Sequence, residues 1–117
     1  MSRRFASVRT SGGDVVSDSC LVADGPWLRT KGLLGRRELP DGEGILLRPA
    51  SSIHMFFMRF PIDAVFLSRD LTVLKVVPHL APWRMASRWR AHAVLELPAG
   101  ACERAGLRVG DRLSLEG

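Results

Sequence analysis

The hydrophobic positions of this chain fall into short runs, and glycine or proline separates most of these runs from one another. The runs have the length of β-strands rather than of helices. The clearest pair, residues 63–68 and 71–77, predicts a hairpin with Arg69 and Asp70 at its turn. The full set of predicted strands covers residues 14–23, 45–48, 53–59, 63–68, 71–77, 92–97 and 112–115.

Two segments follow a helical pattern instead. Residues 26–34 begin at a proline and predict a short helix, and residues 101–105 predict a helical turn that Gly106 caps. Residues 78–91 lack clear periodicity and are expected to form an extended or partly helical connection. Seven short strands and two short helices predict a mainly β fold, either a small barrel or a sandwich.

The length of 117 residues predicts a single domain over residues 1–117, with residues 1–13 as a flexible or extended N-terminal segment. The apolar runs are far shorter than the roughly 20 residues that a membrane-spanning helix needs. Arg9 interrupts the apolar stretch near the N-terminus, so we expect no secretory signal peptide.

Cysteine and histidine positions limit the chemistry. Cys20 and Cys102 form no Cys-x-x-Cys pair, which argues against a disulfide framework or a zinc ribbon and favours a reducing, cytoplasmic location. Metal binding would require His54, His79 and His92 to converge, and their spacing does not favour this. We therefore expect no metal site and no cofactor.

The net charge of +5 and the isoelectric point near 10.5 are compatible with an acidic partner such as nucleic acid. Of the 17 basic residues, 15 are arginine, and they are scattered along the chain. A bias of this kind can reflect genome base composition as well as function. The charge alone therefore does not identify a partner.

Four pieces of the sequence occur together in order: residues 31–36, residues 42–47, residues 54–59 with 61–66, and residues 94–100 with 106–111. In this combination the chain resembles the bacterial and archaeal family known as domain of unknown function number 192, from about Asp14 to the C-terminus. The resemblance implies a compact, mainly β domain without an agreed activity, substrate or cofactor, so it transfers no functional residue. Phe57 stands where this family often carries tryptophan.

His54, Arg59 and Asp63 form the first candidate site, because a strand followed by the Pro61 corner could bring an imidazole, a guanidinium and a carboxylate together. Our leading hypothesis is a non-catalytic module that binds a small polar or anionic ligand there. The alternative is an enzyme with His54 and Asp63 as a general acid/base pair. Strand alternation argues against a tight cluster, and Asp63 could simply anchor the corner by accepting backbone N–H bonds.

The second candidate site is the basic and aromatic segment that comprises Trp83, Arg84, Arg88, Trp89 and Arg90. Indole rings stack on bases and guanidinium groups neutralise phosphates, so this segment offers a second alternative, binding of single-stranded nucleic acid. In the competing interpretation, which the sequence favours, the two tryptophans cover an open end of the core. Glu96 lies within an apolar strand, where pairing with an arginine would avoid a lone buried charge.

Overall fold

The computed structural model describes residues 4–24, 38–56 and 58–117. Nine strands and one short helix make up most of this part of the chain. They are β1 (Arg4–Thr10), β2 (Val15–Ala23), β3 (Glu43–Leu47), β4 (Ser52–His54), β5 (Ile62–Leu67), β6 (Val73–Leu80), β7 (Met85–Ser87), β8 (Ala93–Pro98), α2 (Ala101–Ala105) and β9 (Leu113–Glu116).

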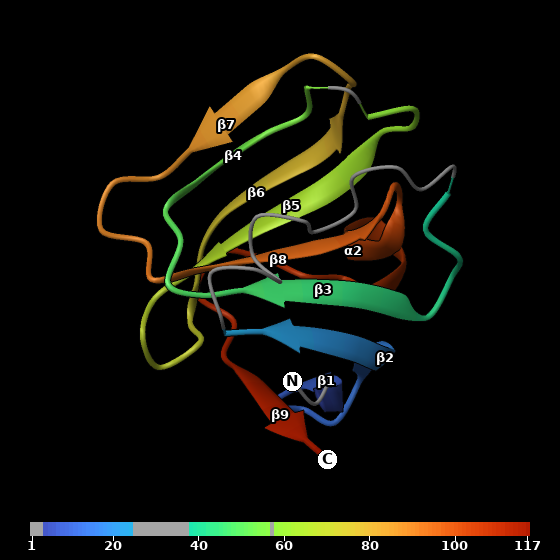
Figure 1. Ribbon diagram of the computed structural model, residues 1–117. Helices are drawn as coiled ribbons and strands as arrows, with labels where there is room; N and C mark the ends of the chain where they lie inside the picture. Colours follow the sequence, from blue (N-terminus) through green and yellow to red (C-terminus); the bar gives the residue numbers. More distant parts are fainter. Residues whose placement is uncertain (1–3, 25–37, 57) are drawn as a thin grey trace.

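Seven of the strands form one curled sheet in the order β6-β5-β8-β3-β2-β1-β9, which gives a half-barrel (Figure 1). All neighbours are antiparallel except β2 and β3, which run parallel. The two edges meet at one end, where Thr72 forms a bridge to Arg112 and the Leu113 N–H donates to the carbonyl of Leu71 at 2.9 Å. The half-barrel is therefore closed at this end.

Each face of the curled sheet has its own hydrophobic core. The first core includes Cys20, Leu95, Leu97 and Cys102, and α2 covers it. The second includes Ile45, Ala64 and Val94, and it is covered by the separate two-stranded sheet of β4 and β7. We call residues 50–56 and 81–92, which contain β4 and β7, the arm.

Two neighbouring interior strands of the sheet, β5 and β8, are buried along their whole length. Both faces of these strands are covered, so their sequences are continuous apolar runs without the usual alternation. Asp63 and Glu96 are the polar exceptions, with exposed fractions of 0% and 6%.

The mainly β fold that the sequence predicted is confirmed. The predicted hairpin is present as β5 and β6, and the helical turn is α2, which ends at Gly106 in a left-handed conformation. The prediction of a strand over residues 53–59 is wrong beyond His54, because the Met58 N–H donates to the carbonyl of Met55 at 3.2 Å and turns the chain. The predicted helix over residues 26–34 lies outside the described residues.

Two strands were missing from the sequence-based prediction. Residues 1–13, expected to be flexible or extended, contain β1, which pairs with both β2 and β9. Within residues 78–91, expected to connect two strands, β6 continues to Leu80 and β7 pairs with β4. In the part of the chain that the structure describes, no helix has the length and hydrophobicity that crossing a membrane requires.

Candidate functional site

The arm has an inner and an outer face. On the inner face Ile53 and Met55 are buried in the second core, with exposed fractions of 7% and 1%. On the outer face His54 lies directly opposite Met85, which is 67% exposed. The ammonium group of Lys75 donates to the carbonyl of Ser87 at 2.9 Å and joins the arm to β6.

Three aromatic rings stack on one another at the end of the arm. The imidazole of His54 lies 4.8 Å from the ring of Phe56, with 29° between the planes. The Phe56 ring in turn lies 6.0 Å from Trp83, with 28° between the planes. Phe56 is 38% exposed and Trp83 is 59% exposed. The arrangement places a row of nearly parallel rings at the surface of the protein.

A tight turn over residues 81–84 holds Trp83 in place. The Arg84 N–H donates to the Ala81 carbonyl at 3.2 Å, and Pro82 occupies the second position of the turn. Trp83, at the third position, has φ 66°, a conformation that usually requires glycine. Met55 fixes this turn against β4: its carbonyl accepts the Trp83 N–H, and its own N–H donates to Arg84, both at 2.7 Å.

A second turn, over residues 88–91, repeats this arrangement. The Ala91 N–H donates to the Arg88 carbonyl at 3.1 Å, and Arg90 has φ 67° at the third position. The guanidinium of Arg90 lies 4.5 Å above the ring of Trp89, which is 76% exposed. Non-glycine residues at positive φ cost about 1–3 kcal/mol each and cluster at functional sites. In each turn of the arm, the residue with the strained backbone is thus one with a large side chain, Trp83 in the first turn and Arg90 in the second.

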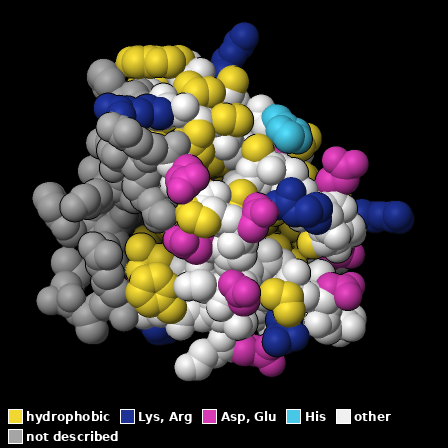
Figure 2. Space-filling view, turned by 90° about the vertical axis from the view of Figure 1, so that its right-hand side faces the viewer, with side chains coloured by type: hydrophobic (Ala, Val, Ile, Leu, Met, Phe, Trp, Pro, Cys, Tyr) yellow, Lys and Arg dark blue, Asp and Glu magenta, His cyan; other side chains and the backbone are white. Residues whose placement is uncertain are grey.

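The charge of the arm is entirely positive. It contains Arg84, Arg88 and Arg90, and no aspartate or glutamate occurs between Glu43 and Asp63 or between Asp70 and Glu96. The upper end of the molecule carries hydrophobic side chains beside lysine or arginine, and the acidic side chains visible on that face lie below it (Figure 2). Three of the arginines that are scattered along the sequence thus lie together on this arm, which contains no carboxylate.

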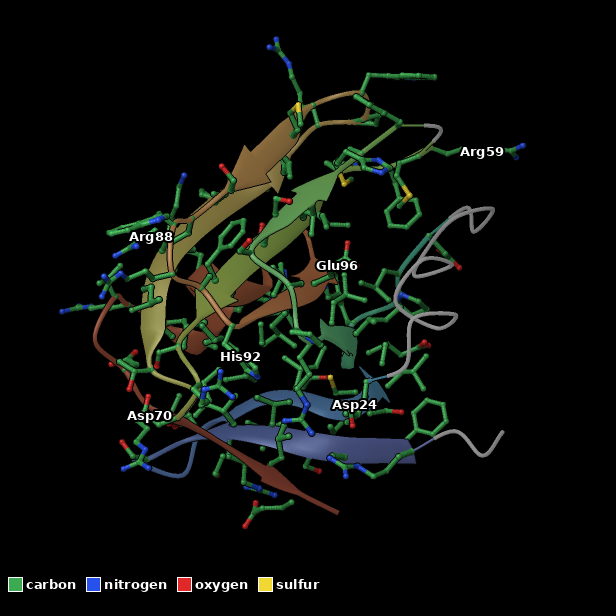
Figure 3. The ribbon with its side chains drawn as sticks, turned by 60° about the vertical axis from the view of Figure 1, so that its left-hand side comes forward. Asp24, Arg59, Asp70, Arg88, His92 and Glu96 are labelled. Atoms are coloured by element: carbon green, nitrogen blue, oxygen red, sulfur yellow. The ribbon has the colours of Figure 1, made fainter. Side chains whose placement is uncertain are left out.

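The candidate residues around the proline corner separate in the structure. Arg59 is exposed and points away from the body of the protein (Figure 3). Asp63 is fully buried on the face that α2 covers, whereas His54 belongs to the arm on the other face. The structure therefore does not bring His54 and Asp63 together.

The carboxylate of Asp63 is occupied by backbone donors. One oxygen accepts the N–H of His79 at 2.9 Å, and the other accepts those of Gly100 at 3.1 Å and Cys102 at 3.0 Å. Gly100 has φ 93°, which its lack of a side chain permits. Burial, together with the nearby Asp63, raises the pKa of the Cys102 thiol to about 12, so this thiol is protonated. Asp63 thus joins β5 to β6 and to the start of α2.

Glu96 points inward on the face that the arm covers (Figure 3). Its cross-strand neighbours are Ile45 and Ala64, both apolar and buried. Burial raises the pKa of the Glu96 carboxyl to about 7, and no arginine of the described residues forms an ion pair with it. Among the described residues no three metal-binding side chains converge, here or elsewhere.

Sequence reasoning identified Trp83 and His54 separately but missed Phe56, which joins them. His54 and Phe56 stand at alternate positions, which indicates that they share a face, but the stacking of Phe56 on Trp83, 27 residues further along, is a tertiary contact. Met85 was missed for the same reason, because its exposure depends on the pairing of β4 with β7.

The fold and the surface together define a class of small, mainly β proteins: a half-barrel sheet with a basic, aromatic arm packed on its second face. The chain belongs to the DUF192 family, described as "Uncharacterized ACR", whose family model matches residues 7–115.

Similar proteins come from archaea and bacteria. A UPF0127 protein of Pyrococcus furiosus is 42% identical over 69 residues, which cover 54% of this chain and 54% of the relative. A UPF0127 protein of Thermococcus sibiricus is 36% identical over 69 residues, which cover 56% of this chain and 43% of the relative. The matched region thus spans about half the length of these curated relatives.

Two solved structures have the same fold over nearly the whole chain. One, from Sinorhizobium meliloti 1021, is described as "a putative transcription regulator"; it has a TM-score of 0.85 and 26% identity, and the match covers 98% of this chain and 96% of that one. The other, a protein of unknown function from Novosphingobium aromaticivorans, has a TM-score of 0.80 and 25% identity, and covers 96% of this chain and 84% of that one.

Proposed function

We propose that this protein is a binding module for single-stranded nucleic acid and that the arm is its binding surface. The observation that carries the proposal is the exposed stack of His54, Phe56 and Trp83 on an arm that has arginines and no carboxylate. Aromatic rings at a surface bind unpaired bases through their faces, and arginines along the same surface bind the phosphates.

The shape of the surface favours this function over binding of a small ligand at the proline corner. Sites for small molecules are concave and enclose most of the ligand. The rings of Phe56 and Trp83 are instead exposed, and the Asp63 carboxylate is occupied by three backbone N–H groups. An extended ligand with repeated rings and repeated negative charges matches the arm better.

The strained turns support the same proposal. In a purely structural connection glycine would fill the positions of Trp83 and Arg90 at a lower energy. Retaining an indole and a guanidinium there is expected when these groups contact a ligand. The Sinorhizobium meliloti protein of the same fold is described in terms of transcription, a process that acts on nucleic acid.

The proposal includes a cytoplasmic location. Cys20 and Cys102 are both buried and unpaired, as is usual for proteins of a reducing compartment. Nucleic acid is available as a ligand in that compartment.

The test is fluorescence anisotropy with a short, labelled oligothymidylate at increasing salt concentration. Neutralisation of three or four phosphates predicts that the logarithm of the affinity falls with the logarithm of the salt concentration with a slope of about −2 to −3. Arg84→Gln is expected to make this slope shallower by about 0.7. Arg108→Gln, an exposed arginine outside the arm, serves as the matched control and is expected to leave the slope unchanged.

A duplex of the same length provides the second comparison. Paired bases cannot stack on the arm, so the duplex is expected to bind more weakly than the single strand. Absence of binding at low salt, or an equal effect of Arg84→Gln and Arg108→Gln, would exclude the arm as a nucleic-acid interface.

A further inference from the structure

A second cationic site lies at the closed end of the half-barrel, where the turn before β6 meets the start of β9. A cavity of about 390 Å³ opens there to solvent. Its polar lining consists of Ser11, Arg48, Arg69, Asp70, Arg112 and Ser114. Residues from four separate segments of the chain contribute, so the cavity exists only in the folded protein.

The backbone around this cavity is fixed by hydrogen bonds. The Leu113 N–H donates to the Leu71 carbonyl at 2.9 Å, and the Ser11 N–H donates to the Arg112 carbonyl at 3.0 Å. Leu71 has φ 66°, and its own N–H donates to Ser68 at 3.0 Å. The elements that carry Arg69 and Arg112 are thus held against one another before any ligand arrives.

The three guanidinium groups differ in how they are engaged. Arg48 is bound to Asp24, which lowers the pKa of that carboxyl. Arg112 makes one long bond of 3.4 Å, from Nε to the backbone carbonyl of Asp70. Among the described residues no ion pair involves Arg69, and it is exposed. Arg69 and Arg112 therefore keep most of their donors for a ligand.

The single carboxylate of the lining belongs to the turn. Asp70 accepts hydrogen bonds from the Ser68 hydroxyl and, at 3.3 Å, from the Thr72 N–H. These bonds lower the pKa of the Asp70 carboxyl, so it is ionised. Because Arg48 is paired with Asp24, the remaining guanidinium groups of Arg69 and Arg112 against the carboxylate of Asp70 leave the cavity with a net charge of +1. The lining thus favours an anion.

We infer that this cavity binds a small phosphorylated molecule, with Arg69 and Arg112 as the groups that hold the phosphate. The planar guanidinium presents paired N–H donors that match phosphate oxygens. The volume lies within the range of roughly 300–1,000 Å³ that small-molecule sites occupy, which exceeds what a phosphate ion alone would fill. The hydroxyls of Ser11 and Ser114 provide hydrogen-bonding groups for the organic part of the ligand.

This site is separate from the arm interface. Leu71 precedes β6 and Trp83 follows it, so the cavity and the aromatic stack lie near opposite ends of that strand. The two proposals can therefore fail independently.

The test is titration of the full chain with glycerol 3-phosphate, inorganic phosphate and succinate at constant ionic strength, followed by amide NMR shifts and by calorimetry. Glycerol 3-phosphate is expected to saturate and to shift the amides of Ser11, Leu71 and Leu113. Inorganic phosphate and succinate are expected to bind more weakly. Arg69→Gln and Arg112→Gln are each expected to lower the affinity for glycerol 3-phosphate about tenfold, which corresponds to the loss of one charge-assisted hydrogen bond.

Arg104→Gln is the matched control, because Arg104 is an exposed arginine that pairs with Asp41 outside the cavity. It is expected to bind glycerol 3-phosphate as the natural protein does. Failure of glycerol 3-phosphate to saturate, or equal binding by Arg69→Gln and the natural protein, would overturn the proposal. If succinate bound with the same affinity as glycerol 3-phosphate, the inference that the cavity recognises a phosphate group would be overturned. Oligonucleotide binding by Arg69→Gln is expected to remain unchanged, which separates this result from the fate of the arm interface.

Discussion

Asp63 and Glu96 lie one position apart across the β5–β8 ladder, and their carboxyl groups point to opposite faces of the sheet. Asp63 is paired with Leu97, and Glu96 is paired with Ala64. Asp63 accepts three backbone N–H bonds on the face of α2, whereas Glu96 is surrounded by apolar neighbours on the face of the arm. Two carboxyl groups at similar depth in the fold therefore have different effects on its stability.

The first prediction concerns Glu96 and pH. Burial raises the pKa of the Glu96 carboxyl from 4.5 to about 7 in the folded protein. Between pH 4.5 and pH 7 this carboxyl is therefore ionised in the unfolded chain but still protonated in the folded protein. The free energy of unfolding is therefore expected to fall by about 3 kcal/mol in total from pH 4.5 to pH 7 because of this group, and to change little above pH 7. Glu96→Gln is expected to remove this part of the pH dependence. Urea denaturation between pH 4 and pH 8 measures it.

Glu103→Gln is the control for this measurement, because Glu103 is an exposed carboxyl on α2. It is expected to keep the pH dependence of the natural protein. The same pH dependence in Glu96→Gln and in the natural protein would show that Glu96 is not a buried, destabilising charge.

The second prediction concerns Asp63. Asp63→Asn keeps the shape of the side chain, but its amide group can accept hydrogen bonds only through one atom. If that oxygen keeps the N–H groups of Gly100 and Cys102, the amide nitrogen faces the N–H of His79. We expect a loss of about 2–4 kcal/mol in the free energy of unfolding. A loss of less than about 0.5 kcal/mol in urea denaturation, as at an ordinary surface site, would contradict this role.

The third prediction concerns the strained turn at Arg90. Arg90→Gly removes the strain of a φ of 67° and also removes the contact with Trp89. The strain is worth about 1–2 kcal/mol, the contact with Trp89 about 0.5–1 kcal/mol, and the greater unfolded-state entropy of glycine costs about 0.4–1 kcal/mol. In Arg90→Gly the free energy of unfolding is therefore expected to stay within about 1 kcal/mol of its value in the natural protein. Arg108→Gly, at an exposed position without positive φ, is expected to lower it. Equal losses in both variants would show that residue 90 is not strained.

Much of the fold could be predicted because local rules determine it. The hairpin of β5 and β6 follows from two apolar runs around Arg69 and Asp70, and α2 follows from Gly100 and Gly106 at its ends. The strand β7 could not be predicted in this way. Only three residues long, it exists because it pairs with β4, and that pairing is a tertiary contact.

The candidate site was predictable only in parts. The sequence identified the basic and aromatic character of residues 83–90 and the imidazole of His54, but it treated them as two sites. Phe56 joins them by stacking on both His54 and Trp83, which a local pattern does not reveal. The assignment of Asp63 to the same site as His54 rested on their closeness in sequence, and the sheet between them separates the two side chains.

The most direct test of the account is the affinity of Trp83→Ala for single-stranded oligothymidylate at fixed, low salt. Stacking of one base is worth about 1–3 kcal/mol, so the affinity is expected to fall by at least about fivefold. Phe5→Ala removes another exposed aromatic ring, on β1 and outside the arm, and is expected to bind as the natural protein does. An unchanged affinity in Trp83→Ala, or an equal loss in Phe5→Ala, would contradict the assignment of the arm as a stacking surface for unpaired bases.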